Sequence, residues 1–195
     1  MWPNGHGRAA PGVESWRSMK SNTITGSFFL LAGLGPLVVY ILLGGVLDVL
    51  STLQTELIAS WMLLSVPIAF MRTKDAMPTG IGKEMAQIGL LIIVISTAGG
   101  MVADSFASVG NEGGRQAVGR LVWASLFVGM AFTGFGYYLQ EFFNRILSGL
   151  LVLLGCIGFL AIGIGGVGDD ASGEMIWPLF MLVMLVLGVT TLRRA

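Results

Sequence analysis

Apolar residues occur in six long runs along the chain, and short polar segments separate them. The runs cover residues 27–47, 53–71, 86–105, 119–139, 146–167 and 174–192. Because a helix needs about 20 apolar residues to cross a bilayer, each run predicts one transmembrane helix. In the second run, Gln54, Glu56 and Pro67 are expected to shorten or kink the helix.

A glycine pair followed by aspartate closes three of these runs. The signature occurs as GGVLD at Gly44 to Asp48, GGMVAD at Gly99 to Asp104 and GGVGDD at Gly165 to Asp170. After each signature, the apolar part of the next run begins at a tryptophan, namely Trp61, Trp123 or Trp177. Similarity that recurs in this way indicates a repeated architecture.

The sequence therefore predicts an all-α polytopic membrane protein in which six transmembrane helices form three repeated helical hairpins. The hairpins cover about 27–72, 84–140 and 145–193, within a transmembrane domain over 27–195. Each hairpin holds two spans, so the three copies are related by rotation about the membrane normal, unlike the halves of inverted-repeat transporters. Residues 1–26 are expected to form a flexible cytoplasmic leader, since the first apolar run is too long for a cleaved signal peptide.

The composition also favours a membrane location. Hydrophobic residues make up 54% of the 195 residues and charged residues 11%, whereas roughly a quarter of the residues in soluble domains are charged. The lipid bilayer is the partner that this composition indicates directly. The formal net charge is zero, so no nucleic-acid partner is expected.

The distribution of Lys and Arg predicts the orientation. With a cytoplasmic N-terminus, nine of these residues lie on the cytoplasmic side, and only Arg115 and Arg120 lie on the opposite side. Positively charged loops are retained in the cytoplasm, so we expect a cell (cytoplasmic-type) membrane with both termini cytoplasmic. The opposite face is acidic and carries Asp48, Glu56, Asp104, Glu112, Asp169, Asp170 and Glu174.

The signature residues have a structural interpretation and a functional alternative. They are Gly44, Gly45, Asp48, Gly99, Gly100, Asp104, Gly165, Gly166 and Asp169. A glycine pair allows close helix approach and a left-handed cap, and the aspartate can accept hydrogen bonds from the amides that begin the next helix. We favour this interpretation as a turn. The alternative is an external cation site made of three symmetry-related carboxylates.

Two other groups of residues are assigned structural roles. Trp61, Trp123 and Trp177 are predicted to anchor their spans at the membrane interface, with stacking on a ligand as the alternative. Small residues recur every fourth position on two spans, as Ser96 and Gly100, and as Ser125, Gly129 and Thr133. This spacing predicts close packing against another span or another subunit.

Reactive groups are sparse in the apolar runs. All formal charges fall at run ends or in loops, so no charged conduction path is expected. The single histidine, His6, lies in the leader, and Cys156 is the single cysteine, so we expect no cofactor and no histidine- or cysteine-based metal site. Of the candidate nucleophiles Ser96, Thr97, Ser125 and Cys156, only Ser96 has a possible base on its helix, Asp104, two turns away. The sequence therefore does not indicate an enzyme.

Two function classes remain. The plan of three hairpins with cytoplasmic ends resembles that of the HdeD-type acid-resistance membrane proteins, but this resemblance concerns architecture and assigns no functional residue. The favoured hypothesis is a non-enzymatic membrane protein that acts by association, as a homo-oligomer or as an accessory subunit of a complex, because small-residue faces are frequent. The alternative is a small permease or channel for a neutral or weakly polar solute. A continuous polar cavity between the hairpins would favour this alternative.

Overall fold

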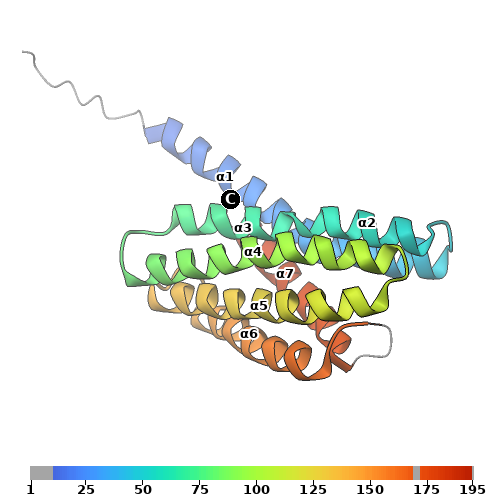
Figure 1. Cartoon of the computed structure of the whole chain (residues 1–195). Coiled ribbons are helices and arrows are strands. Elements are labelled where there is room, and N and C mark those ends of the chain that lie inside the picture. The colour runs from blue at the N-terminus through green and yellow to red at the C-terminus, as the bar shows by residue number, and fades with distance from the viewer. Residues whose placement is uncertain (1–10, 169–171, 195) are drawn as a thin grey trace, which may run out of the picture.

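The computed structural model describes residues 11–168 and 172–194, and within them every regular element is a helix. The elements are α1 (Pro11–Pro36), the π-helix η1 (Leu37–Val46), α2 (Thr52–Leu63), α3 (Ser65–Ala76), α4 (Ile81–Ser108), α5 (Glu112–Leu139), α6 (Arg145–Gly165), the 3-10 helix η2 (Ser172–Ile176) and α7 (Trp177–Leu192). They form one elongated bundle (Figure 1).

Six helical segments of the described chain are long and apolar enough to cross a membrane. They are Ser21–Val46, Leu53–Ala76, Ile81–Ser108, Glu112–Leu139, Arg145–Gly165 and Ser172–Leu192. The prediction of an all-α polytopic membrane protein with six spans is therefore confirmed. The third and fourth helices, α4 and α5, are longer than their apolar runs. The turn between them lies at Gly110, whose φ is 72°.

One irregularity of the second span lies close to a proline. The span is interrupted at Leu64, three residues before Pro67, and α2 and α3 together form one candidate span. Proline cannot donate the helical hydrogen bond and clashes with the preceding turn, which accounts for the interruption. Within the described chain, the first helix covers Pro11–Pro36. Residues 11–26 of the predicted leader lie within α1, and residues 1–10 lie outside the described chain, so the flexible leader stays a prediction.

The helices do not pack simply as three separate hairpins. Close neighbours are α4 with α5, α5 with α6, and α1 with α7, whereas α6 and α7 contact each other only slightly. Figure 1 shows α4, α5 and α6 lying side by side along the bundle. The repeat of three hairpins thus remains a prediction from the sequence.

Glycines set the closest helix contacts. A Cβ atom built on Gly129 of α5 would lie 2.7 Å from the carbonyl oxygen of Gly89 on α4, and one on Gly89 would lie 2.5 Å from the carbonyl oxygen of Gly129. Between α1 and α7, a Cβ on Gly188 would lie 3.0 Å from the amide nitrogen of Leu30. Burial against lipid does not drive helix association in a membrane, so such backbone contacts provide much of the packing.

The end of the bundle where Asn22 of α1 lies beside Arg194 is closed by aromatic packing. Phe29, Phe70, Tyr137 and Phe143 are fully or almost fully buried there, and the Tyr137 and Thr73 hydroxyls form a buried hydrogen bond between α5 and α3. At the same end the Asn22 side chain donates to the carbonyl oxygen of Arg194 at 2.9 Å. The first and last spans therefore begin and end on the same side of the bundle.

Candidate functional site

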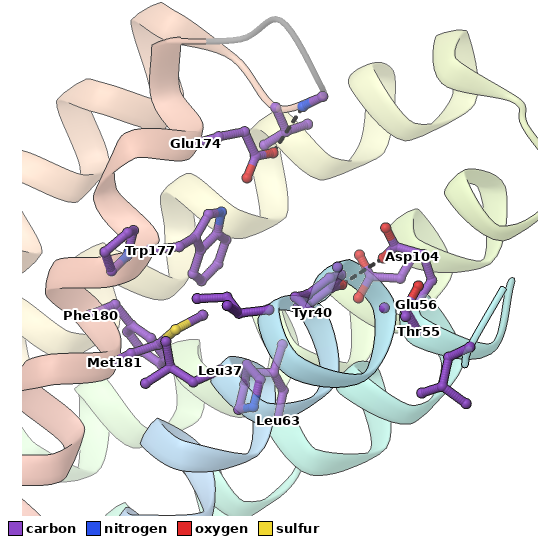
Figure 2. A pocket seen from close by; sticks show the side chains of 18 of the residues that line it. Leu37, Tyr40, Thr55, Glu56, Leu63, Asp104, Glu174, Trp177, Phe180 and Met181 are labelled. Atoms are coloured by element: carbon purple, nitrogen blue, oxygen red, sulfur yellow. Dashed lines mark hydrogen bonds between the residues drawn. The ribbon is translucent and has the colours of Figure 1, made fainter. Parts of the chain in front are cut away.

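A cavity of about 850 Å³ occupies the opposite end of the bundle. It lies between η1 and α2 on one side and η2 and α7 on the other, with α4 and α5 completing its walls. Figure 2 shows Glu56 and Asp104 across the cavity from Trp177 and Phe180. The cavity reaches from the loops of the acidic end to the middle of the spans at Pro36, Leu63 and Met181.

The π-helix positions one wall of the cavity. Pro36 has no amide hydrogen for a bond to the carbonyl four residues earlier, and the wider helix begins at the next residue, Leu37. Tyr40 and Gly44 of this helix both line the cavity. A Cβ on Gly44 would lie 2.6 Å from Thr55 Cγ2, so glycine here allows α2 to approach. π-helices are rare in proteins as a whole, and those that occur are often found at functional sites.

A capping box places the first acidic residue of the cavity. The Ser51 hydroxyl accepts from the Gln54 amide, and the Gln54 side chain accepts from the Ser51 amide at 2.9 Å. This reciprocal pairing fixes the start of α2 and sets Glu56 one turn inside the helix. Glu56 is only 7% exposed, and its Oε2 accepts a hydrogen bond of 2.8 Å from the Tyr40 hydroxyl.

A serine connects this carboxylate to α4. Ser60 Oγ lies 2.7 Å from Asp104 Oδ2 and 2.8 Å from the backbone carbonyl oxygen of Glu56. A hydroxyl has one hydrogen, so these two acceptors share or exchange it. We call Asp48, Glu56 and Asp104, which all line the cavity, the acidic wall. The hydrogen bonds join η1, α2 and α4 at one point.

The opposite side carries the only basic residue among those that line the cavity. Arg115 Nη2 lies 3.6 Å from Glu174 Oε1, and Arg115 Nη1 lies 3.7 Å from Glu112 Oε2. Glu174 Oε1 also accepts a hydrogen bond of 2.9 Å from the Gly168 amide. Because one guanidinium faces four lining carboxylates, Arg115 offsets only part of the negative charge of the cavity.

Below Glu174, the cavity is lined by Trp123, Trp177 and Phe180, which we call the aromatic wall. The rings of Trp123 and Trp177 pack edge-to-face with centroids 5.3 Å apart, and those of Trp177 and Phe180 with centroids 5.6 Å apart. Edge-to-face geometry is favourable for such rings. Leu37 and Leu63 complete an apolar floor (Figure 2).

The three glycine–aspartate signatures have different environments. Gly44 and Gly45 end η1, and Asp48 itself adopts the left-handed conformation, with φ 48°. Gly165 ends α6 and Gly166 caps it with φ 79°. The expectation of a turn at the second signature is wrong, because Gly99 and Gly100 lie inside α4.

Gly99 and Gly100 serve packing instead of a turn. Trp123 occupies the space where a Cβ on Gly100 would lie, and a Cβ on Gly99 would lie 2.6 Å from Val122 Cγ1. Asp169, the third aspartate of the alternative cation site, lies outside the described residues. Within the described chain, no three Asp, Glu, His or Cys residues gather in a way that could hold a metal ion.

The tryptophans also separate into two environments. Trp61 is 66% exposed on α2, where interface anchoring stays a prediction. Trp123 is only 6% exposed and Trp177 is partly buried against it. For Trp123, interface anchoring is wrong, because the ring is enclosed between α4, α5 and α7 and contacts other aromatic rings.

The predicted small-residue faces are only partly brought together. Ser96, Gly129 and Thr133 are buried, and Gly129 lies against α4. Ser125 instead lines a separate hollow with Phe159 and Gly163 of α6, because a spacing of four residues drifts around a helix of 3.6 residues per turn. In the described chain, the Ser96 hydroxyl has no hydrogen-bond partner.

Sequence reasoning did not identify the cavity, although several signals for it were present. Glu56 and Asp104 lie near the ends of candidate spans, where charges were expected. Their enclosure beside the cavity was not expected, since Glu56 is buried and Asp104 half-buried. One signal was the spacing of Glu56 and Ser60, which are four residues apart and share a face of α2. Another was the pair Arg115 and Arg120, the two exceptions to the positive-inside pattern. Arg115 pairs with Glu174, and Arg120 Nε donates to the Gly163 carbonyl at 2.8 Å, near the end of α6. Both exceptions therefore have local partners.

No family model matches the chain, and no curated protein or solved structure matches it either.

Proposed function

We propose that this integral membrane protein is a non-enzymatic permease that takes a small solute into the cavity at its acidic end. The observation that carries the proposal is the cavity itself, since about 850 Å³ lies within the range of roughly 300–1,000 Å³ for ligand pockets. Its polar entrance and apolar floor suit a solute that has a polar and an apolar part. The sequence favoured association over permeation. The cavity ends at an apolar floor and is not a continuous polar path, but it supports entry of a solute from the acidic end.

The walls of the cavity contain the elements that a permease needs for movement. The π-helix begins at Leu37, and the second span is interrupted at Leu64, so both irregular points lie beside the cavity floor. Irregular turns are the usual places where long helices bend. Bending there would separate the floor from the aromatic packing at Phe29 and Phe70 and open a path to the other side.

The test is binding of three probes of similar shape and different charge: tetraphenylphosphonium, triphenylphosphine oxide and tetraphenylborate. At least one of them is expected to bind the purified protein in an uncharged detergent and to enter proteoliposomes faster than protein-free liposomes. Leu63→Trp, which fills the cavity floor, is expected to lower that affinity at least about tenfold, because the ring takes the space of the ligand. Equilibrium dialysis with radiolabelled probes measures the affinity.

The matched control is Leu153→Trp, which adds the same ring on α6, where Leu153 is 53% exposed. Its affinity is expected to equal that of the unaltered protein. Met181→Trp provides a second filling variant on α7. Equal binding by the unaltered protein and both filled variants, or no binding of any probe, would reject the cavity as a solute site.

We place the basic end of the bundle in the cytoplasm, following the positive-inside rule. The termini then lie inside the cell, and the cavity faces outward. In a Cys156→Ser background, a cysteine at Asp48 should react with a membrane-impermeant maleimide added to intact cells, and one at Thr79 should not. The opposite labelling pattern would invert this orientation.

A second candidate function is self-association through α6. Gly149, Cys156 and Gly163 are seven residues apart and so share one face of the helix. No atom of the described chain lies within 4 Å of a Cβ built on Gly149 or Gly163, beyond the helix's own backbone and nearest neighbours, and Cys156 is exposed. Small residues that are open on one side allow a second helix to approach closely.

Cys156 allows a direct test of this candidate, because it is the only cysteine in the chain. Copper phenanthroline is expected to convert the protein in native membranes to a disulfide-linked dimer, visible on a non-reducing gel. The matched control is a Cys156→Ser protein with a cysteine at Val94, an exposed position on α4, which should stay monomeric. Equal cross-linking at both positions would indicate random collision, and no cross-linking at Cys156 would reject this interface.

A further inference from the structure

The charges that line the cavity are strongly unequal in sign. Four carboxylates line it, those of Asp48, Glu56, Asp104 and Glu174, and one guanidinium, that of Arg115. Arg115 lies near Glu174, and this single guanidinium offsets only part of the negative charge of the four lining carboxylates. A charge inside a membrane protein is costly to maintain, and its presence usually marks a functional site. The potential in the cavity therefore favours cations over anions.

The acidic wall is directed to the same space as the aromatic wall. Figure 2 shows Glu56 and Asp104 on one side of the cavity and Trp177 with Phe180 on the other. Indole rings attract cations through their electron-rich faces, most strongly where water is excluded. A bound molecule that spans the cavity would meet carboxylates with one part and aromatic or aliphatic side chains with the rest.

An inorganic cation does not fit these surroundings. A divalent ion needs six or more oxygen ligands, and the described residues contain no group of three acidic, His or Cys side chains that could hold one. The hydrogen bonds from Tyr40 and Ser60 already engage Glu56 and Asp104. Each of these carboxylates therefore already has its own hydrogen-bond donor.

We infer that the cavity binds an amphipathic organic cation, with its charge beside the acidic wall and its apolar body against the aromatic wall. This inference rests on the proposed permease function and names its substrate class. A volume of about 850 Å³ accommodates several rings or a branched alkyl body. An anion of the same size is repelled, and a neutral molecule of the same size gains only the apolar contacts.

The test compares the three probes on one protein. Tetraphenylphosphonium is expected to bind at least about tenfold more tightly than neutral triphenylphosphine oxide, and tetraphenylborate should not bind the cavity. Asp104→Asn and Glu56→Gln should each lower the affinity for tetraphenylphosphonium about tenfold and leave the affinity for the oxide unchanged within about twofold. The matched control is Asp75→Asn, an exposed carboxylate at the other end of the second span, which should change neither affinity.

The outcomes separate this inference from the function on which it rests. If the oxide or tetraphenylborate binds as tightly as tetraphenylphosphonium, and Leu63→Trp removes that binding, the cation inference is overturned and the permease proposal stands. If no probe binds, both are overturned. If tetraphenylphosphonium binds equally well to Leu63→Trp and to the unaltered protein, it binds outside the cavity, which also overturns the inference. The comparison of probes on the unaltered protein needs no variant, so a misfolded variant does not prevent the decision.

Discussion

Gly129→Leu is expected to abolish the stable packing of α4 on α5. A Cβ atom at this position would lie 2.7 Å from the carbonyl oxygen of Gly89 and 3.0 Å from the amide nitrogen of Ile93. Both are backbone atoms in the middle of a helix and cannot move aside as a side chain would. Overpacking typically costs about 1–3 kcal/mol where side chains can adjust. Because two helices must separate here, we expect more than about 3 kcal/mol, and a melting temperature at least about 6 °C lower.

The matched control is Gly113→Leu in the first turn of α5. This substitution adds the same side chain to the same helix, but Gly113 is exposed and a Cβ there would lie no closer than 3.8 Å to the nearest side-chain atom, Asn111 Oδ1. The two variants have the same composition and the same hydropathy, so a difference between them measures packing alone. Tryptophan-fluorescence melting and size-exclusion chromatography in mild detergent provide the measurement. Equal melting temperatures would show that α4 and α5 are not held by this contact.

The number and position of the helices could be predicted because they depend on local composition. Apolar runs of sufficient length must satisfy their backbone hydrogen bonds internally in lipid, so six runs become six helices whatever their partners are. The pairing of helices depends instead on shape. Gly188 of α7 contacts Leu30 of α1, although most of the sequence lies between the two residues. No spacing rule links positions so far apart in sequence. The repeat of signatures predicted α6 with α7, while α7 packs mainly on α1.

The candidate site could be predicted only in part, for a related reason. Asp48 and Asp104 were identified from the signature, and both line the cavity. Glu56 was noted only as a polar residue near the start of a span, because its burial depends on how Tyr40 approaches it. That approach depends on the π-helix, which shifts the helical register after Pro36. A pattern based on 3.6 residues per turn cannot anticipate such a shift.

Trp123 and Trp61 offer the second test, since both were assigned the same anchoring role and the structure separates them. Trp123→Ala is expected to lower the melting temperature by about 6 °C or more, because truncating a buried tryptophan costs about 3–5 kcal/mol in soluble cores. The van der Waals and ring contacts that the substitution removes stabilise a membrane protein as they stabilise a soluble core. Trp61→Ala should change it by less than about 2 °C, since Trp61 is 66% exposed.

The contact between Trp123 and Gly100 can be isolated by a double-mutant cycle. In the unaltered protein, Gly100→Ala should be destabilising, because the Trp123 ring fills the space of the new methyl group. In the Trp123→Ala protein that space is empty, so the same Gly100→Ala change should be neutral or stabilising. The change of sign is specific to direct contact, because two independent sites would give additive effects. Additive losses of melting temperature would place the Trp123 ring elsewhere, and with it the aromatic wall that the substrate class requires.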